Sequence, residues 1–256
     1  MSAPSAAWQG LFDEIARWRD AGRAAEFWWR DDDAARPDPA LARLLALAQR
    51  TSTPLSLAAI PMRSERETFE NTGSLVSILQ HGSDHANRAG PDEKKTEFAA
   101  SEAPAEVIAR LAAARAQLEA LAGKRFLPVL APPWNRLPKH LAAYLAAAGF
   151  RGLSQYGARS RAEAAPGLRQ VNTHVDIIAW RSGRGFIGAG DALAAATRHL
   201  AAKRMAAADP GEATGWLTHH AVHDEAAWGF LERLFESTRK LSTVTWRRPE
   251  ELFHIS

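Results

Sequence analysis

The chain has 256 residues, of which 46% are hydrophobic and 24% are charged. This length fits one α/β barrel or two small domains, and the apolar share excludes a disordered chain. The chain contains nine histidines and no cysteine. The absence of cysteine excludes a disulfide framework, a thiolate zinc site, an iron–sulfur cluster and a cysteine nucleophile. Any metal site must therefore consist of imidazole and carboxylate groups.

Charge and hydropathy exclude two further classes of protein. The 32 basic and 29 acidic residues give a net charge of +3, and the longest basic runs are pairs such as Lys94-Lys95. Because nucleic-acid-binding surfaces usually show longer basic patches, we expect no nucleic-acid partner. No segment approaches the ~20 apolar residues of a membrane span. Asp13 and Glu14 stand where a secretion signal would be apolar, so we expect a cytoplasmic protein.

Helices and strands alternate along the chain. Helical spacing of apolar residues predicts helices over 8–21, 41–50, 106–122, 138–148, 191–206 and 224–236. Short apolar runs predict strands at 27–29, 55–60, 75–79, 126–130, 150–154, 171–178, 216–218 and 244–246, and the polar stretch 88–101 is predicted as a loop. This alternation is typical of one α/β domain over 1–256 with a mainly parallel sheet of seven or eight strands.

Charged and imidazole side chains follow several of the predicted strands. Three strands end in 31–33, 81–85 and 219–220, and a fourth ends in 132–136. The carboxyl ends of parallel strands share one edge of the sheet, where active sites of such folds lie. Polar groups are costly to gather beside an apolar core unless something binds them. We therefore expect a functional site at this edge.

The three consecutive aspartates at 31–33 are the strongest indication of a functional site in the sequence. Adjacent carboxylates repel one another, so a site that assembles them usually holds a cation or raises one pKa. The alternative interpretation is an acidic loop that caps the next helix. The preceding Trp28-Trp29 strand and the adjacent Arg30 favour the functional interpretation.

Two histidine groups suit metal binding or proton transfer. If Gly82 opens a helical turn, His81 and His85 project from one face and can hold one ion; the alternative is a polar turn with an exposed histidine. His219 suits a general acid or base, because histidine titrates near neutral pH. For His220 and His223 we favour a polar helix start with Asp224 near its N-cap over a second metal site.

Five short motifs in this order resemble the polysaccharide deacetylases of the NodB-homology type, carbohydrate esterase family four. They are RDDDA at 30–34, HGSDHAN at 81–87, APPWN at 131–135, HVDIIAW at 174–180 and LTH at 217–219. The resemblance covers 27–219, after an N-terminal helical segment at 1–26 that we expect to pack on the domain. It implies a distorted (β/α) barrel.

The resemblance also implies a site. Asp33, His81 and His85 would bind a divalent metal, with zinc expected, and leave an open position for water. Asp32 would be the general base, and the metal would polarise an acetyl carbonyl.

The remaining implied roles belong to residues near the other strand ends. The backbone N–H of Trp134 would stabilise the oxyanion, and His219 would protonate the leaving amine with Asp176 orienting it. Leu217 would line the acetyl pocket. Further predicted substrate contacts are Pro133, Asn135 and His174.

Two departures from the family pattern leave alternatives open. Ala131 stands at the position of the arginine that positions the base, so Arg136 or Arg30 would substitute. The extra carboxylate allows Asp31 and Asp32 to be the pair in place of Asp32 and Asp33. His174, just before the fourth motif, would be an additional ligand or a substrate contact.

We expect hydrolysis of an N-acetyl group on a small-molecule sugar or an oligosaccharide. The alternatives are a catalytically silent barrel that binds a carbohydrate or partner, and a metal-dependent hydrolase of another amide or of a phosphoester.

Overall fold

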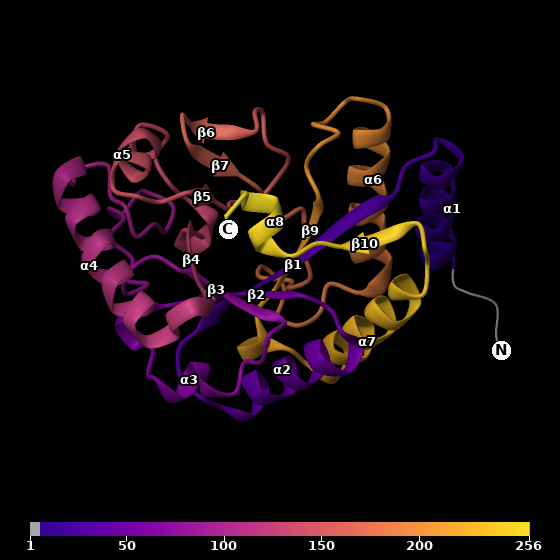
Figure 1. The fold of residues 1–256 in the computed structure, drawn as a ribbon, viewed down its shortest axis with the longest axis horizontal. Coiled ribbons are helices and arrows are strands. Elements are labelled where there is room, and N and C mark those ends of the chain that lie inside the picture. The colour runs from indigo at the N-terminus through magenta and orange to yellow at the C-terminus, as the bar shows by residue number, and fades with distance from the viewer. Residues whose placement is uncertain (1–5, 256) are drawn as a thin grey trace.

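The computed structural model describes residues 6–255, and a curled sheet surrounded by helices runs through them (Figure 1). The strands of this part are β1 (Ala25–Ala34), β2 (Leu55–Ala59), β3 (Val76–Gln80), β4 (Phe126–Leu130), β5 (Gly152–Leu153), β6 (Glu163–Ala165), β7 (Leu168–Gln170), β8 (Val175–Asp176), β9 (Thr214–Thr218) and β10 (Val244–Trp246). Their order is β6-β7-β5-β4-β3-β2-β1-β9-β8, and β10 pairs with the start of β1. Every strand pair is parallel except β6 with β7. The predicted distorted (β/α) barrel is confirmed, with ten described strands where seven or eight were expected.

The outer layer consists of α1 (Ala6–Asp20), α2 (Pro39–Thr51), α3 (Glu67–Glu70), α4 (Pro104–Ala122), α5 (Leu141–Ala147), α6 (Ala189–Arg204), α7 (Glu225–Arg239) and α8 (Pro249–Phe253). Short 3₁₀ turns are η1 (Pro61–Arg63), η2 (Gly123–Arg125), η3 (Pro133–Asn135) and η4 (His220–Val222). The Asp224 carboxylate accepts a hydrogen bond from the Ala227 N–H at 2.8 Å, which confirms the predicted N-cap of α7. No helix of residues 6–255 has the length and apolar character to cross a membrane.

The alternation of side chains along β1 divides the core into layers. Phe27 and Trp29 belong to the apolar cluster between the sheet and the outer helices, whereas Trp28 belongs to a separate cluster inside the barrel. Successive side chains of a strand point to opposite faces, so Arg30 follows Trp28 into the interior. β1 lies between β2 and β9 and is almost completely buried. The aspartates at the carboxyl end of β1 therefore extend from a buried strand that is paired on both sides.

The amino end of the barrel interior is closed by α8. Figure 1 shows α8 crossing the centre of the strands near the C-terminus. Phe253 contacts the Trp28 ring edge-on, with 6.1 Å between centroids. A Cβ atom at Gly152 would lie 2.4 Å from the Phe253 ring, so only glycine fits at this position of β5. With this end filled, the carboxyl ends of the strands remain for a site.

Two regions differ from the sequence prediction. The hairpin β6–β7 was missed because each strand has three residues, although Pro166-Gly167 with φ +76° at Gly167 is a turn signal. The strand predicted over 171–178 is reduced to β8. Its neighbours change midway, since the Val171 N–H donates to the Leu153 carbonyl and the His174 N–H to the Gly215 carbonyl. A single strand cannot follow both neighbours.

The first helix packs on the outside of the barrel against α6. The Trp18 indole N–H donates to the Leu200 carbonyl at 3.2 Å, and the buried Glu14 pairs with Arg204 at 2.7 Å. Residues 1–5 of the predicted N-terminal segment lie outside the described residues.

Candidate metal centre and active site

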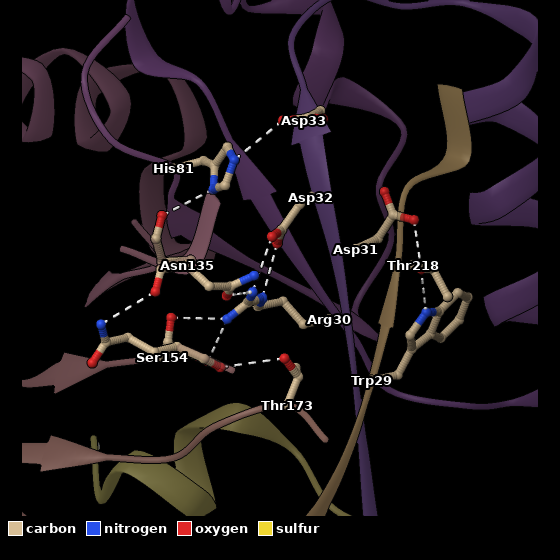
Figure 2. A network of polar contacts seen from close by, with 12 residues as sticks. Trp29, Arg30, Asp31, Asp32, Asp33, His81, Asn135, Ser154, Thr173 and Thr218 are labelled. Atoms are coloured by element: carbon tan, nitrogen blue, oxygen red, sulfur yellow. Dashed lines mark hydrogen bonds and ion pairs between the residues drawn. The ribbon is translucent and has the colours of Figure 1, made fainter. Parts of the chain in front are cut away.

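The three aspartates at the end of β1 point in different directions. Figure 2 shows Asp32 and Arg30 on one side of the strand and Asp31 with Thr218 on the other. Strict alternation would place Asp33 beside Asp31. However, the pairing of β1 with β2 shifts register between Asp31 and Ala34, and Asp33 has a φ of +71°. This bulge turns the Asp33 carboxylate toward His81.

Asp33, His81 and His85 form a compact group of metal-ligand type. The Nε2 atoms of both histidines lie 3.2 Å from Asp33 Oδ1, and one ligand atom of each residue lies within 4.8 Å of the others. The structure thus brings together the three residues that the sequence resemblance assigned to a metal.

The donor chemistry of this group fits a cation. His81 Nδ1 lies 2.9 Å from the Ala131 carbonyl, so Nδ1 carries the proton and Nε2 presents a lone pair. Asp33 Oδ1 is buried without a hydrogen-bond donor of good geometry. Burial alone would raise the pKa of Asp33, but His81 and His85 lower it well below its usual range. Burial lowers the pKa of His81, and Asp32 and Asp33 reverse the direction, so the net shift is upward. The group therefore favours added positive charge, which a metal ion would supply.

The loop that carries His85 is not the expected helical turn. Gly82 and His85 both have positive φ values, of 64° and 57°, which interrupt any helix. Instead, the buried Glu97 carboxylate accepts hydrogen bonds from the N–H groups of Ser83 and His85 at 2.7 and 3.2 Å. Glu97 lies in the stretch predicted only as a polar loop, and no motif or spacing in that stretch indicates this role. It fixes the loop that presents both imidazoles.

Arg30 holds Asp32 inside the barrel. Its Nε and Nη2 atoms lie 2.8 and 2.9 Å from the two carboxylate oxygens of Asp32, and both side chains are almost completely buried. Nη1 donates to the Ser154 carbonyl at 2.9 Å, and Nη2 donates to Asn135 Oδ1 at 2.6 Å (Figure 2). Arg30 is therefore the residue that orients Asp32. The alternative choice of Arg136 is corrected: it is exposed and donates to the Lys95 carbonyl.

The turn after β4 places Trp134 beside His85. In η3, the N–H groups of Asn135 and Arg136 donate to the carbonyls of Pro132 and Pro133, which leaves the Trp134 N–H outside this hydrogen-bonding pattern. Trp134 has a φ of +55°, and its ring packs against the His85 ring with 4.5 Å between centroids. The positive φ at Trp134 thus accompanies the contact of its ring with His85, and its peptide N–H has no backbone acceptor within the turn.

His219 follows β9, and its environment differs from the expected one. Asp176 does not hydrogen-bond to His219; its two oxygens accept from the Ile178 N–H at 3.0 Å and the Trp180 indole N–H at 2.8 Å. Trp180 then meets the His219 ring edge-on at 4.7 Å. The expected direct contact of Asp176 with His219 is therefore absent, and Trp180 lies between the two side chains. Leu217 is completely buried in β9.

The sequence interpretation missed the pairing of Asp31 with His220. His220 is buried, and its Nδ1 lies 2.5 Å from Asp31 Oδ1, while Thr218 Oγ1 and the His220 N–H donate to Asp31 Oδ2. Burial lowers the pKa of His220, but Asp31 outweighs this and raises it. His220 is thus a partner of the first aspartate, not an ordinary residue of a polar helix start. Because Asp31 is already bound on the helix side, Asp32 and Asp33 are the pair that faces the site.

His174 does not reach the site. It is buried at the amino ends of β8 and β9 in a group with His199 and Glu212. His174 Nδ1 accepts from the Gly215 N–H at 2.9 Å, so Nε2 carries the proton and points at Glu212 Oε2, 3.3 Å away. Because Nδ1 of His174 is used as an acceptor, Nε2 has no lone pair for a metal, and this second group lacks one of the three donors that a metal site would need. Both expected roles of His174, ligand and substrate contact, are corrected.

Comparison with known proteins identifies the architecture. The chain matches no family model and no curated protein sequence. Among solved structures, it is similar to the peptidoglycan deacetylase PdaC from Bacillus subtilis (12% identity, 90% of this chain and 91% of that one, TM-score 0.54). It is also similar to a family 4 acetyl xylan esterase from Clostridium thermocellum in complex with a cobalt ion (15% identity, 90% and 91%, TM-score 0.53). The PuuE allantoinase is a further match (14% identity, 91% and 90%, TM-score 0.61).

The chain has the polysaccharide deacetylase fold. In this deacetylase fold, the five sequence motifs come together at the carboxyl ends of β1, β3, β4, β8 and β9. Only the first residue of the fourth motif, His174, lies too far toward the amino ends to take part. The shared fold accounts for the convergence, because short motifs far apart in sequence meet where parallel strands end.

Proposed function

We propose that this chain is a metal-dependent hydrolase that removes the N-acetyl group from an acetylated sugar. The observation that carries the proposal is the group of Asp33, His81 and His85 beside an arginine-held carboxylate, Asp32. One carboxylate and two imidazoles are the ligand set of open catalytic zinc sites, so zinc is the expected ion. The similarity to an esterase in complex with cobalt supports a divalent metal in this fold.

Each nearby side chain has a task in this proposal. A divalent metal, when bound, acts as a Lewis acid at the acetyl carbonyl and makes water more acidic. Asp32, held by Arg30, accepts the proton of the attacking water. The Trp134 N–H donates to the oxygen that becomes negatively charged in the transition state. His219 then donates a proton to the leaving amine, and acetate and a free amine result. Pro133 and Asn135 would contact the sugar, and the completely buried Leu217 would lie behind the wall of the acetyl pocket.

The first test separates metal binding from turnover. We expect one equivalent of metal in protein purified without chelator, and its loss in Asp33→Asn and His85→Ala. Asp32→Asn and His219→Ala should retain the metal, while kcat falls roughly 10²- to 10⁴-fold, because each removes one proton-transfer group. The exposed His140→Ala serves as the matched control. Elemental analysis and acetate release provide the measurements; metal loss in Asp32→Asn would contradict the assigned roles.

The second test identifies the reaction. Acetate release should be measured from N-acetylated monosaccharides, oligosaccharides and sugar nucleotides, and ring opening should be measured with allantoin because an allantoinase shares the fold. A wild-type protein without metal would instead indicate a silent binding barrel. Two metal ions per chain with phosphatase activity would indicate a phosphoester hydrolase.

A further inference from the structure

A polar groove extends from the candidate active site across the segments that follow β4 and β5. One cavity of about 450 Å³ is lined by Asn135, Lys139, Tyr156 and Arg161 among others. A second, of about 370 Å³, shares Asn135 and has Lys94 and Arg136 on its walls. We call the two together the basic groove. Each has the volume of a site for a small ligand.

The basic groove is joined to the reaction centre by direct contacts. Asn135 lines both cavities, and its side-chain oxygen accepts a hydrogen bond from Arg30, the residue that holds Asp32. Asn135 also directly follows Trp134, the proposed oxyanion donor. A sugar whose acetyl group lies at the metal ligands would therefore extend its next substituent into this groove.

The charge of the basic groove is net positive, and the carboxylate on its walls is that of Glu93 in the second cavity. Within residues 6–255, Lys94, Arg136, Lys139 and Arg161 form no ion pair with a carboxylate. A fifth cation, Arg159, is neutralised by Asp209 at 2.8 Å and is not counted. All four unpaired cations are exposed to solvent.

We propose that the basic groove binds the phosphate groups of the substrate, so that the acetylated sugar is a sugar diphosphate derivative rather than a neutral glycan. This inference rests on the proposed function. Four cations against the single carboxylate of Glu93, on two cavities that meet at Asn135, match a ligand with several negative charges, whereas a neutral polymer would leave these cations without a partner. Arginine recognises phosphate by paired hydrogen bonds and lysine by its point charge.

The test compares two substrates in charge-reversal variants. Acetate release should be measured with UDP-N-acetylglucosamine and with neutral N,N′-diacetylchitobiose, in wild type and in the double variant Lys139→Glu with Arg161→Glu. The matched control is Lys124→Glu with Arg151→Glu, two exposed cations just before β4 and β5, at the opposite ends of these strands. Binding of inorganic pyrophosphate, followed by calorimetry, gives a readout that does not need turnover.

We expect the groove variant to raise KM for the sugar diphosphate at least ~10-fold per lost charge contact, and to leave KM for chitobiose within about twofold. Pyrophosphate affinity should fall in parallel, and the control should match wild type. Unchanged KM for both substrates, or no pyrophosphate binding by wild type, would overturn this inference while leaving deacetylation intact. The wild type could also bind pyrophosphate through Lys139 and Arg161 but release acetate from no compound. That result would support the phosphate-binding groove and contradict the proposed deacetylase function.

Discussion

Three identical residues in a row have three different environments in this protein. Asp31 is bound by His220 and Thr218 on the helix side of β1, Asp32 by Arg30 inside the barrel, and Asp33 by no donor of good geometry. The difference follows from alternation along a strand, modified by one bulge. Neighbouring carboxylates thus avoid mutual repulsion and serve separate tasks.

Replacement of Arg30 by lysine should reduce catalysis without removing the metal. Lysine keeps the charge but cannot contact both oxygens of Asp32 and still reach Ser154, so the carboxylate would be misplaced. We expect kcat to fall about 10²-fold, with KM and metal content nearly unchanged. Steady-state kinetics and elemental analysis provide the measurement. Arg136→Lys is the matched control, and equal kcat values in the two variants would contradict the positioning role.

His223 should make the protein less stable in mild acid. Burial, chiefly, lowers the pKa of His223 to about 4, and its Nε2 accepts a hydrogen bond from the His219 N–H at 3.3 Å. Between pH 6.5 and 4 the unfolded chain binds a proton at this residue before the folded chain does. The free energy of unfolding therefore falls as the pH falls through this window.

The measurement is urea unfolding of wild type and His223→Gln from pH 7 to 4. Glutamine keeps an acceptor but does not titrate, so the variant should lose less stability toward pH 4. The exposed His140→Gln should follow wild type. Parallel curves for wild type and His223→Gln would exclude His223 as the source.

At the scale of elements, the loop after β3 brings His81 and His85 together as predicted, but not through the helical turn that we expected. A four-residue spacing suggested a helical turn, yet the two imidazoles converge through a loop with two positive φ values. Glu97, from the far end of the next segment, supplies the acceptor that the loop backbone needs. Local spacing alone does not contain this partner.

Substitution of Gly82 by alanine should displace this loop. A Cβ atom there would lie 2.0 Å from Glu97 Oε2, and the φ of +64° already disfavours alanine. We expect metal affinity to fall roughly 10- to 100-fold, as when an outer support of a metal ligand is lost. Gly22→Ala is the matched control, because Gly22 has a φ of +68° and nothing within 4 Å of the added atom.

Calorimetric zinc titration of both variants provides the measurement. Gly22→Ala should cost about 1 kcal/mol of stability from backbone strain and leave zinc affinity unchanged. If Gly82→Ala also bound zinc like wild type, Glu97 would not be fixing the loop.

At the scale of the molecule, the three proposed metal ligands come from separate parts of the sheet. Asp33 ends β1, whereas His81 and His85 follow β3, two strands away in the sheet order. An ion bound by all three cross-links segments about fifty residues apart in sequence. Metal binding should therefore contribute to the stability of the barrel as a whole.

Removal of the metal should lower the melting temperature by several degrees. At a free zinc concentration 100 times the dissociation constant, binding stabilises the folded state by about 2.7 kcal/mol. For a chain of this size, that corresponds to roughly 5–10 °C. Differential scanning calorimetry with and without chelator provides the measurement. The melting temperature of Asp33→Asn should not change when zinc is added. An equal melting temperature of the wild type with and without chelator would argue against a metal ligated by these residues.

Most of the architecture can be predicted from local sequence patterns. Apolar periodicity placed all eight expected strands and the six longer helices, because each of those patterns is local. Polar motifs after several strands predicted a site at one edge of the sheet, and the resemblance of these motifs to a known family suggested Asp33, His81 and His85 within it. The short hairpin β6–β7 and α8 carried too few residues to give a periodic signal.

The pairing of side chains across the barrel, in contrast, became known from the three-dimensional arrangement of the strands. Arg30 rather than Arg136 holds Asp32, Glu97 fixes the metal-binding loop, and Asp31 pairs with His220 almost 190 residues away. His174 belongs to a buried cluster at the opposite ends of the strands. The physical reason is that a side-chain pair depends on the direction of each bond at its Cα atom and on packing across the barrel. Neither quantity is encoded in the spacing of residues along the chain.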